Sequence, residues 1–248
     1  MSIIMKDRFS DKASGYAAFR PKYPETLFNH LYTHTKAFDA AWDAGTGNGQ
    51  VAAVLAGKFN RVYATDISIK QLMKVPNMPN LSSFVADEAA PQISDTSIDL
   101  ITVAQAIHWF QVDKFCDEVT RVAKPGALLA TWGYGLMQLP PAYQPAVDHF
   151  YSKVVGPYWD AERKHIDNSY ADISIPFREL RLSENMQMTY EWDINILEGY
   201  LNTWSSVGNY IKERGENPVT PFINELKAKD LPGSVPVSFP LFTRLFRL

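Results

Sequence analysis

Short apolar runs alternate with amphipathic stretches through the first half of the chain. The runs are almost continuously apolar and end in polar residues, as expected for strands buried on both faces of a parallel sheet. The expected strands are 38–42, 61–66, 81–88, 97–104 and 127–132. The expected helices between them are 51–55, 67–73 and 113–123. Four alternating strand–helix units predict an α/β protein with a doubly wound parallel sheet.

The segments on either side of this alternating core have other patterns. Residues 1–37 are interpreted as an N-terminal helical cap. A first helix is expected over 11–19, and a second begins at Pro24, where the missing N–H is tolerated. Residues 38–133 are the predicted core. Residues 134–248 are expected to supply a helical insertion after the fifth strand and then strands that complete the same sheet.

Within the C-terminal part, residues 134–185 have the pattern of the insertion, and residues 186–192 alternate as a strand does. An aromatic-rich stretch, 197–211, predicts one helix. The last run, 235–242, contains two prolines, which favour an edge strand because proline cannot donate to a ladder of hydrogen bonds.

Three glycines at alternate positions, Gly45, Gly47 and Gly49, lie between the first strand and its helix. A glycine turn in this place lets the backbone approach a bound nucleotide closely. A dinucleotide-binding turn requires G-x-G-x-x-G, but Gln50 occupies the position of its last glycine. The spacing therefore disfavours an NAD-type dehydrogenase, and a purely structural turn is the other interpretation.

Acidic residues end the next two strands. Asp66 lies 17 residues after Gly49, and an acid at the end of the second strand of such folds accepts hydrogen bonds from ribose hydroxyls. Its alternative role is to cap the helix over 67–73. Asp87 ends the third strand, where a solvated loop acid is the alternative. Because the carboxyl ends of parallel strands meet at one edge, these acids, the glycine turn and residues 105–110 should converge on one ligand site.

Composition narrows the possible partners. The 248 residues are 46 % hydrophobic with a net charge of −3, and no basic run suggests binding to nucleic acid or an anionic membrane. The single cysteine, Cys116, excludes an intrachain disulfide framework, and no cluster has convincing metal-ligand spacing. No apolar run approaches the ~18 residues that span a bilayer, and no secretory signal is evident. We expect a cytoplasmic monomer or homodimer without a metal.

The pattern Asp43-x-Gly45-x-Gly47-x-Gly49, with its flanking strand and helix, resembles the cofactor loop of class I S-adenosylmethionine (SAM) methyltransferases. This general resemblance covers residues 38–133. The chain also resembles a narrower group, the trans-aconitate methyltransferase-like branch, which methylates small carboxylic acids. The residues that carry the narrower resemblance are Phe19-Arg20-Pro21-x-Tyr23-Pro24, Ala106-x-His108-Trp109, Pro157-Tyr158-Trp159 and Thr203-Trp204-Ser205.

The resemblance implies a Rossmann-like sheet of seven strands in the order 3-2-1-4-5-7-6, with the last strand antiparallel. It implies SAM as cofactor and S-adenosylhomocysteine as its product. The glycine turn would lie under the methionine moiety, Asp66 would hold the ribose, Asp87 would lie near the adenine, and Gln105 would line the cofactor through its backbone. The full set of expected cofactor contacts is Tyr16, Asp43, Gly45, Thr46, Gly47, Gly49, Asp66, Ile67, Ala86, Asp87, Glu88 and Gln105.

The methyl acceptor is expected to be a small molecule, and a carboxylic acid is the favoured class. A carboxylate is already ionised, so it needs cations to hold it rather than a base. Arg20 and His108 are the predicted catalytic residues, and Trp109, Trp159 and Arg163 are the predicted acceptor contacts. A neutral acceptor would instead need a base, for which His108 is best placed. Ordinary core and surface roles for these residues, and a noncatalytic SAM-binding protein, are the remaining alternatives.

Overall fold

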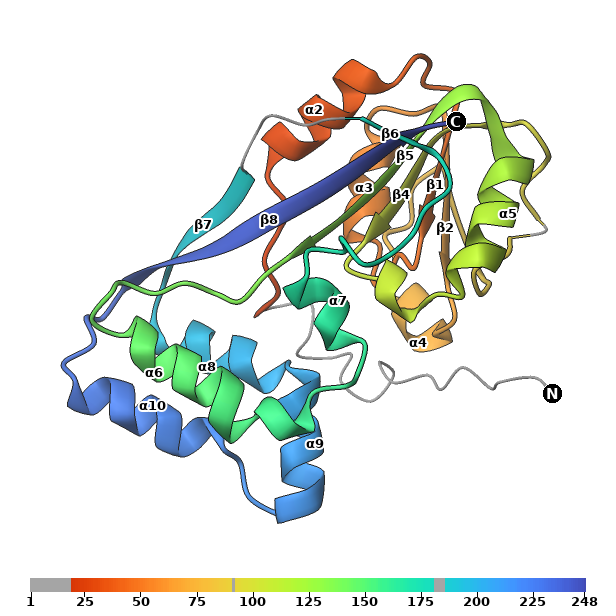
Figure 1. Ribbon diagram of the computed structural model, residues 1–248. Coiled ribbons are helices and arrows are strands. Elements are labelled where there is room, and N and C mark those ends of the chain that lie inside the picture. Colours follow the sequence, from red (N-terminus) through yellow and green to blue (C-terminus); the bar gives the residue numbers. More distant parts are fainter. Residues whose placement is uncertain (1–18, 91, 181–185) are drawn as a thin grey trace.

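A twisted sheet with helices on both faces forms the centre of the computed structural model (Figure 1), which describes residues 19–90, 92–180 and 186–248. Five strands are parallel: β1 (Ala40–Ala44), β2 (Arg61–Asp66), β3 (Leu81–Val85), β4 (Ile98–Ala104) and β5 (Ala123–Tyr134). Three further strands are antiparallel to their neighbours: β6 (Arg178–Leu180), β7 (Met186–Trp192) and β8 (Val235–Arg247).

The strand order is β3-β2-β1-β4-β5-β8-β6, and β7 pairs with β8 beyond that path. The predicted order is therefore confirmed, with the long last strand antiparallel beside β5. The difference is that two strands share the position expected for the sixth strand. β7 pairs with residues 235–241 of β8, and β6 pairs with residues 245–247.

Apolar positions at helical spacing fix the helices on the two faces of the sheet. On α5 (Val112–Val122), Phe115, Cys116, Val119 and Val122 are all buried, which places this stripe against one face. The other face is covered by α2 (Glu25–His34) and α3 (Gln50–Ala56). Their buried residues Leu27, Leu31, Val51 and Leu55 belong to the hydrophobic core on this face. Two short helical turns, α4 (Ile69–Leu72) and η2 (Ile107–Trp109), follow β2 and β4 directly.

A separate layer of helices lies at one end of the sheet (Figure 1). It contains α6 (Gln144–His149), which continues as a π-helical turn η3 (Phe150–Val154), then η4 (Gly156–Tyr158), α8 (Ile194–Asn202), α9 (Ser205–Arg214) and α10 (Val219–Ala228). The helix α7 (Arg163–Asp167) lies between this layer and the sheet (Figure 1). No helix in the described ranges has the length and apolarity needed to cross a membrane.

The single helix expected over 197–211 is wrong, because the structure has two helices there. The Thr203 hydroxyl donates to the Tyr200 carbonyl (2.7 Å) at the end of α8, and Trp204 adopts an extended backbone. The indole of Trp204 packs against the rings of Phe150 and Trp159. Packing of one large side chain therefore fixes the break. The helix expected over 11–19 lies almost wholly outside the described residues.

Residues 235–242, expected as an edge strand, belong to the longer strand β8. Residues 235–240 have a regular ladder only to β7, as an edge strand does, whereas residues 241–247 also pair with β5. The two prolines occur in the half that carries only the ladder to β7. The Ser238 N–H donates to the Gln138 carbonyl (3.0 Å), on the side away from β7. Pro236 and Pro240 share this parity, so their missing N–H groups remove no hydrogen bond from the β7 ladder.

Candidate functional site

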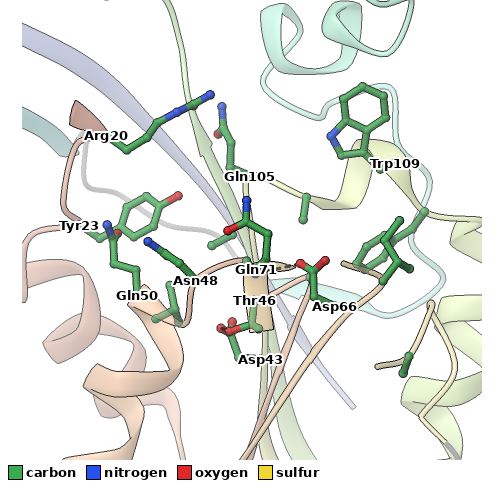
Figure 2. A pocket seen from close by; sticks show the side chains of 18 of the residues that line it. Arg20, Tyr23, Asp43, Thr46, Asn48, Gln50, Asp66, Gln71, Gln105 and Trp109 are labelled. Atoms are coloured by element: carbon green, nitrogen blue, oxygen red, sulfur yellow. Dashed lines mark hydrogen bonds between the residues drawn. The ribbon is translucent and has the colours of Figure 1, made fainter. Parts of the chain in front are cut away.

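A cavity opens at the carboxyl ends of the parallel strands, where the expected convergence of loops occurs (Figure 2). It encloses about 1130 Å³, counting the space at its open mouth. The turn after β1, the ends of β2, β3 and β4, and the end of β5 each contribute to its wall. The residues that line it and were expected at the site are Arg20, Asp43, Gly45, Thr46, Gly47, Asp66, Ile67, Ala86, Asp87, Gln105 and Trp109.

The three glycines of the turn all have a left-handed backbone, with φ between 57° and 82°. They differ in what a side chain would meet. A Cβ at Gly45 would lie 2.7 Å from the Ala106 Cβ, and one at Gly49 would lie 3.0 Å from Val75. A Cβ at Gly47 would meet no atom of the described residues within 4 Å. Packing thus requires two of the glycines, whereas Gly47 leaves space open in the cavity.

Asp66 holds the turn in place from the end of β2. Its Oδ2 accepts the Gly47 N–H (2.9 Å), and its Oδ1 accepts the Ser68 N–H (2.8 Å). Ser68, not Asp66, occupies the N-cap position of α4. The carboxylate therefore orders both the glycine turn and the start of α4, while it also lines the cavity.

Asp43 lies at the base of the turn and is 1 % exposed. Its carboxylate accepts hydrogen bonds from the hydroxyls of Thr46 (2.5 Å) and Thr102 (2.7 Å). Burial disfavours the charged form and raises the pKa of Asp43 to about 6, although the two hydroxyls oppose this shift. Asp43 and Thr46 thus form a buried polar floor under the cavity (Figure 2).

Asp87 lies on the wall that follows β3, together with Ala86 and near Ile67. Its carboxylate accepts the Ala89 N–H (2.9 Å) and pairs with the Lys114 ammonium (2.6 Å). Partial burial alone would raise the pKa of Asp87, but the Lys114 and Ala89 hydrogen bonds outweigh it and lower the pKa. Asp87 is thus a charged group at the cavity wall, held by partners on both oxygens.

A chain of hydrogen bonds links β4, β5 and the N-terminal segment across the cavity. Gln105 has a left-handed backbone (φ 53°), and its side-chain oxygen accepts the Tyr134 N–H (2.9 Å). The Tyr134 hydroxyl in turn accepts a hydrogen bond from Arg20 Nη1 (2.6 Å). Arg20 and Gln105 lie on one side of the cavity and Trp109 stands at another (Figure 2).

His108 does not face the cavity, contrary to the expectation of a catalytic base. It is 8 % exposed, and its Nδ1 lies 2.9 Å from the Tyr170 hydroxyl. Burial lowers the pKa of His108 to about 3, and the charges of Arg163 and His165 act in the same direction. The structure thus favours the alternative interpretation, a satisfied histidine at the start of a helical turn, here η2. The neighbouring Trp109 points to the cavity instead.

Arg163 and Trp159 also lie outside the cavity wall. The guanidinium of Arg163 is 4.7 Å from the centre of the Trp159 ring, and its Nε donates to the Tyr151 hydroxyl (2.8 Å). Trp159 packs in turn on Trp204. These contacts join the insertion to the helical layer, so we carry neither residue forward as an acceptor contact.

Two expected cofactor contacts among the described residues are likewise absent from the cavity wall. Gly49 turns toward Val75. Glu88 is fully buried, and its Oε1 accepts the Gln111 N–H (3.0 Å) just before α5, so this side chain turns away from the site. Tyr16 lies outside the described residues.

Sequence reasoning missed several polar and aromatic residues of the wall. Tyr134 is the last residue of β5, so the expectation that ligands bind at the carboxyl ends of strands could have found it. Gln71 follows a serine by three residues, which is equally a helix-capping pattern. No spacing rule separates Tyr23, Asn48 and Gln50 from their neighbours. All five line the cavity.

The sequence and the fold are both similar to those of known methyltransferases. The family described as Methyltransferase domain matches residues 42–131. A Dictyostelium discoideum protein named as a methyltransferase is 32 % identical over 246 residues, which covers 95 % of this chain and 93 % of the relative. A Saccharomyces cerevisiae protein named as an S-adenosylmethionine-dependent methyltransferase is 23 % identical and covers 87 % of each chain.

A solved structure described as a type II methyltransferase from Anaeromyxobacter dehalogenans aligns with a TM-score of 0.85. It is 33 % identical and covers 92 % of this chain and 98 % of that one. The strand order with an antiparallel last strand and the glycine turn between β1 and α3 agree with these similarities. The chain therefore belongs to the class I SAM-dependent methyltransferases.

Proposed function

We propose that this protein transfers the methyl group of SAM to a carboxylate of a small acidic molecule and forms a methyl ester. The observation that carries the proposal is the Arg20–Tyr134 pair. Arg20 Nη1 donates to the Tyr134 hydroxyl (2.6 Å), and both side chains line the same cavity as the glycine turn. A guanidinium beside a phenol suits a carboxylate, because both can donate to it.

The residues of the cavity fit SAM. Gly47 leaves space where any other residue would place a side chain, and Asp66 brings a carboxylate that can accept hydrogen bonds from a ribose diol. Ala86 and Ile67 offer apolar surface beside Asp87, which suits a base that carries an amino group. When bound, SAM supplies an electrophilic methyl group on a positively charged sulfur.

The acceptor then needs orientation rather than deprotonation. An ionised carboxylate oxygen forms the new C–O bond with its own lone pair, the electrons of the broken S–C bond stay on sulfur, and no proton moves. Arg20 and Tyr134 would hold that carboxylate in line with the methyl group, and alignment supplies much of the rate of such a displacement. The buried position of His108 supports a reaction without a histidine base.

The test pairs small mono-, di- and tricarboxylic acids with their methyl esters and follows methyl transfer from labelled SAM. For the acid that the parent enzyme turns over, Arg20→Gln should lower kcat/KM by about 10- to 100-fold, which is the range for losing a charged hydrogen bond. Tyr134→Phe should lower it by several-fold. Both variants should bind S-adenosylhomocysteine with nearly parental affinity, measured by calorimetry.

Arg61→Gln is the matched control. Arg61 donates to the Tyr63 hydroxyl (3.3 Å) at an exposed position away from the cavity, so the same type of pair is broken without effect on the acceptor. Equal turnover of an acid and its ester by the parent enzyme would count against a carboxylate site. Binding of SAM without transfer to any acid or neutral acceptor would favour a noncatalytic role.

A further inference from the structure

Gln71 lines the wall of the cavity, and within the described residues its side chain has no hydrogen-bond partner. It is 4 % exposed, and it lies on α4, five residues after Asp66. Figure 2 shows its amide among the labelled residues of the site, between Asp66 and Asn48 in this view. Its amide is open to the cavity and is not one of the fully enclosed polar groups that lack a partner in the described part of the chain. Neither the family resemblance nor the proposed function assigns it a role.

The local sequence offers Gln71 a structural role that the structure does not use. Ser68-x-x-Gln71 has the form of a capping box, in which the glutamine reaches back to the N–H of the first residue. Here the Ser68 N–H donates to Asp66 Oδ1 instead (2.8 Å), and Ser68 makes no side-chain capping bond. Asp66 has therefore taken the place of Gln71 at the start of the helix, and the amide is left to face the cavity.

A buried amide of this kind has a strong preference for a partner. A buried amide without a partner has lost the hydrogen bonds that it makes to water in the unfolded chain. A buried amide with a partner has replaced those hydrogen bonds. Most buried side-chain amides in folded proteins are satisfied for this reason. The cavity is where a partner for Gln71 can arrive, so a bound ligand with hydroxyl or amino groups would satisfy it.

We propose that Gln71 binds a ribose hydroxyl of the cofactor beside Asp66, an inference that rests on SAM as the cofactor. A carboxylate can only accept hydrogen bonds, and both Asp66 oxygens already accept one from the backbone. Each hydroxyl of a ribose both donates and accepts. The Gln71 amide supplies the donor that Asp66 lacks, and it also offers an acceptor. The two side chains together would thus select a ribonucleoside with a free diol.

Calorimetry with S-adenosylhomocysteine and its 2′,3′-dideoxy analogue tests this assignment. Gln71→Met keeps the length of the side chain and removes its hydrogen-bonding groups. It should weaken S-adenosylhomocysteine by about five- to tenfold, as expected for the loss of one or two neutral hydrogen bonds. It should change the affinity for the dideoxy analogue much less. Gln71→Glu, which removes the donor and adds a charge near Asp66, should also weaken S-adenosylhomocysteine.

Thermal unfolding without ligand separates this role from a structural one. If Gln71 capped α4, Gln71→Met would lower the melting temperature. If the amide serves the ligand, the melting temperature should be unchanged, because the substitution removes no hydrogen bond of the ligand-free fold. Gln187→Met, on the exposed face of β7, is the control for the substitution itself.

The outcomes distinguish the inference from the function on which it rests. A parent protein that does not bind S-adenosylhomocysteine would overturn the proposed function. A parent that binds it while both Gln71 variants bind equally well would overturn the role of Gln71 alone. Equal losses for S-adenosylhomocysteine and the dideoxy analogue would overturn the assignment to the ribose.

Discussion

Single residues of the glycine turn combine two demands, a left-handed backbone and space for a ligand. Of the three glycines, only Gly47 meets both demands, because a side chain added there would extend into the open space of the cavity. A residue that tolerates a left-handed backbone therefore tests the ligand without breaking the fold. Asparagine is such a residue, whereas a β-branched one is not.

Gly47→Asn should weaken S-adenosylhomocysteine at least about tenfold, because the new side chain would occupy the cofactor's space. Gly215→Asn is the matched control. Gly215 ends α9 with φ 77°, and a Cβ added there would also meet no described residue within 4 Å, but Gly215 does not line the cavity. Calorimetry on both variants should show a loss only for Gly47→Asn. Unchanged affinity in a folded Gly47→Asn variant would contradict the placement of the cofactor.

His108 makes stability depend on pH, because burial depresses its pKa to about 3. In the unfolded chain the same imidazole titrates near 6.5. Above that pH the histidine is neutral in both states, and its titration does not change the free energy of unfolding. As the pH falls below 6.5, His108 binds a proton in the unfolded state but stays neutral in the folded state. The free energy of unfolding therefore decreases progressively down to about pH 3. The slope for one such group reaches at most about 1.4 kcal/mol per pH unit.

Urea unfolding between pH 7.5 and 5 should therefore show a steeper loss of stability in the parent than in His108→Asn, which cannot titrate. His149→Asn is the control, since His149 is an exposed residue of α6. Parallel curves for the parent and His108→Asn would contradict the buried neutral histidine. The pH profile of kcat/KM should show no titration that His108→Asn removes.

The rule that ligands bind at the carboxyl ends of parallel strands located most of the site, but it could not predict where each side chain points. Asp66, Asp87 and Gln105 follow strands and do line the cavity. His108 and Trp109 are consecutive in one tight turn and point in different directions, one to Tyr170 and one to the cavity. Spacing gives the loop to which a residue belongs, whereas packing around the loop decides which side chain faces the ligand.

At the scale of elements, the turn after β1 and the loop after β4 touch each other beside the cavity. A Cβ at Gly45 would lie 2.7 Å from the Ala106 Cβ and 3.2 Å from the Phe110 ring. The φ of 68° adds a cost of roughly 1–2 kcal/mol for any residue with a Cβ. The close approach of these two loops explains why a glycine is needed at this position, where a side chain would meet protein.

Gly45→Ala should therefore destabilise the fold by more than the left-handed backbone alone, roughly 2–3 kcal/mol when the overpacking is added. Ala106→Gly in the same chain should recover part of that loss, because it removes the closest contact but leaves the backbone strain. Urea unfolding of the parent, both single variants and the double variant measures the coupling. If the changes in unfolding free energy of the two single variants add up to that of the double variant, the two positions are not in strained contact.

Elements of the core were predictable because their apolar periods are clear, whereas the C-terminal elements depend on distant packing. The pattern predicts β2 with the observed bounds and α5 to within one residue at each end. Among the C-terminal elements only the clearly alternating β7 is predicted as well. The break between α8 and α9 follows from the place of Trp204 among rings from other segments. The position of β8 within the sheet depends on which of its residues pair with β5, β6 and β7. Neither is encoded in a local window of sequence.

At the scale of the whole molecule, one hydrophobic core joins the sheet to the helical layer. It extends from α2 and α3 through β5 and β8 to α6, α8 and α10. Phe239 of β8 lies at the junction, fully buried, with ring contacts to Tyr134 of the cavity wall and to Tyr200 of α8. The chain beyond residue 133 therefore supports the cavity directly, and we expect the sheet and the helical layer to unfold together.

Phe222→Ala tests this expectation from the far side of the helical layer. Phe222 of α10 stacks on Phe150 with ring centres 4.5 Å apart, and it does not line the cavity. Its truncation should destabilise the protein by about 3–5 kcal/mol, as is usual for a buried phenylalanine. If the core is continuous, tryptophan fluorescence, circular dichroism and binding of S-adenosylhomocysteine should all be lost in one coincident urea transition, shifted to lower urea. A helical layer that melts first, while S-adenosylhomocysteine binding persists, would instead show two units that fold separately.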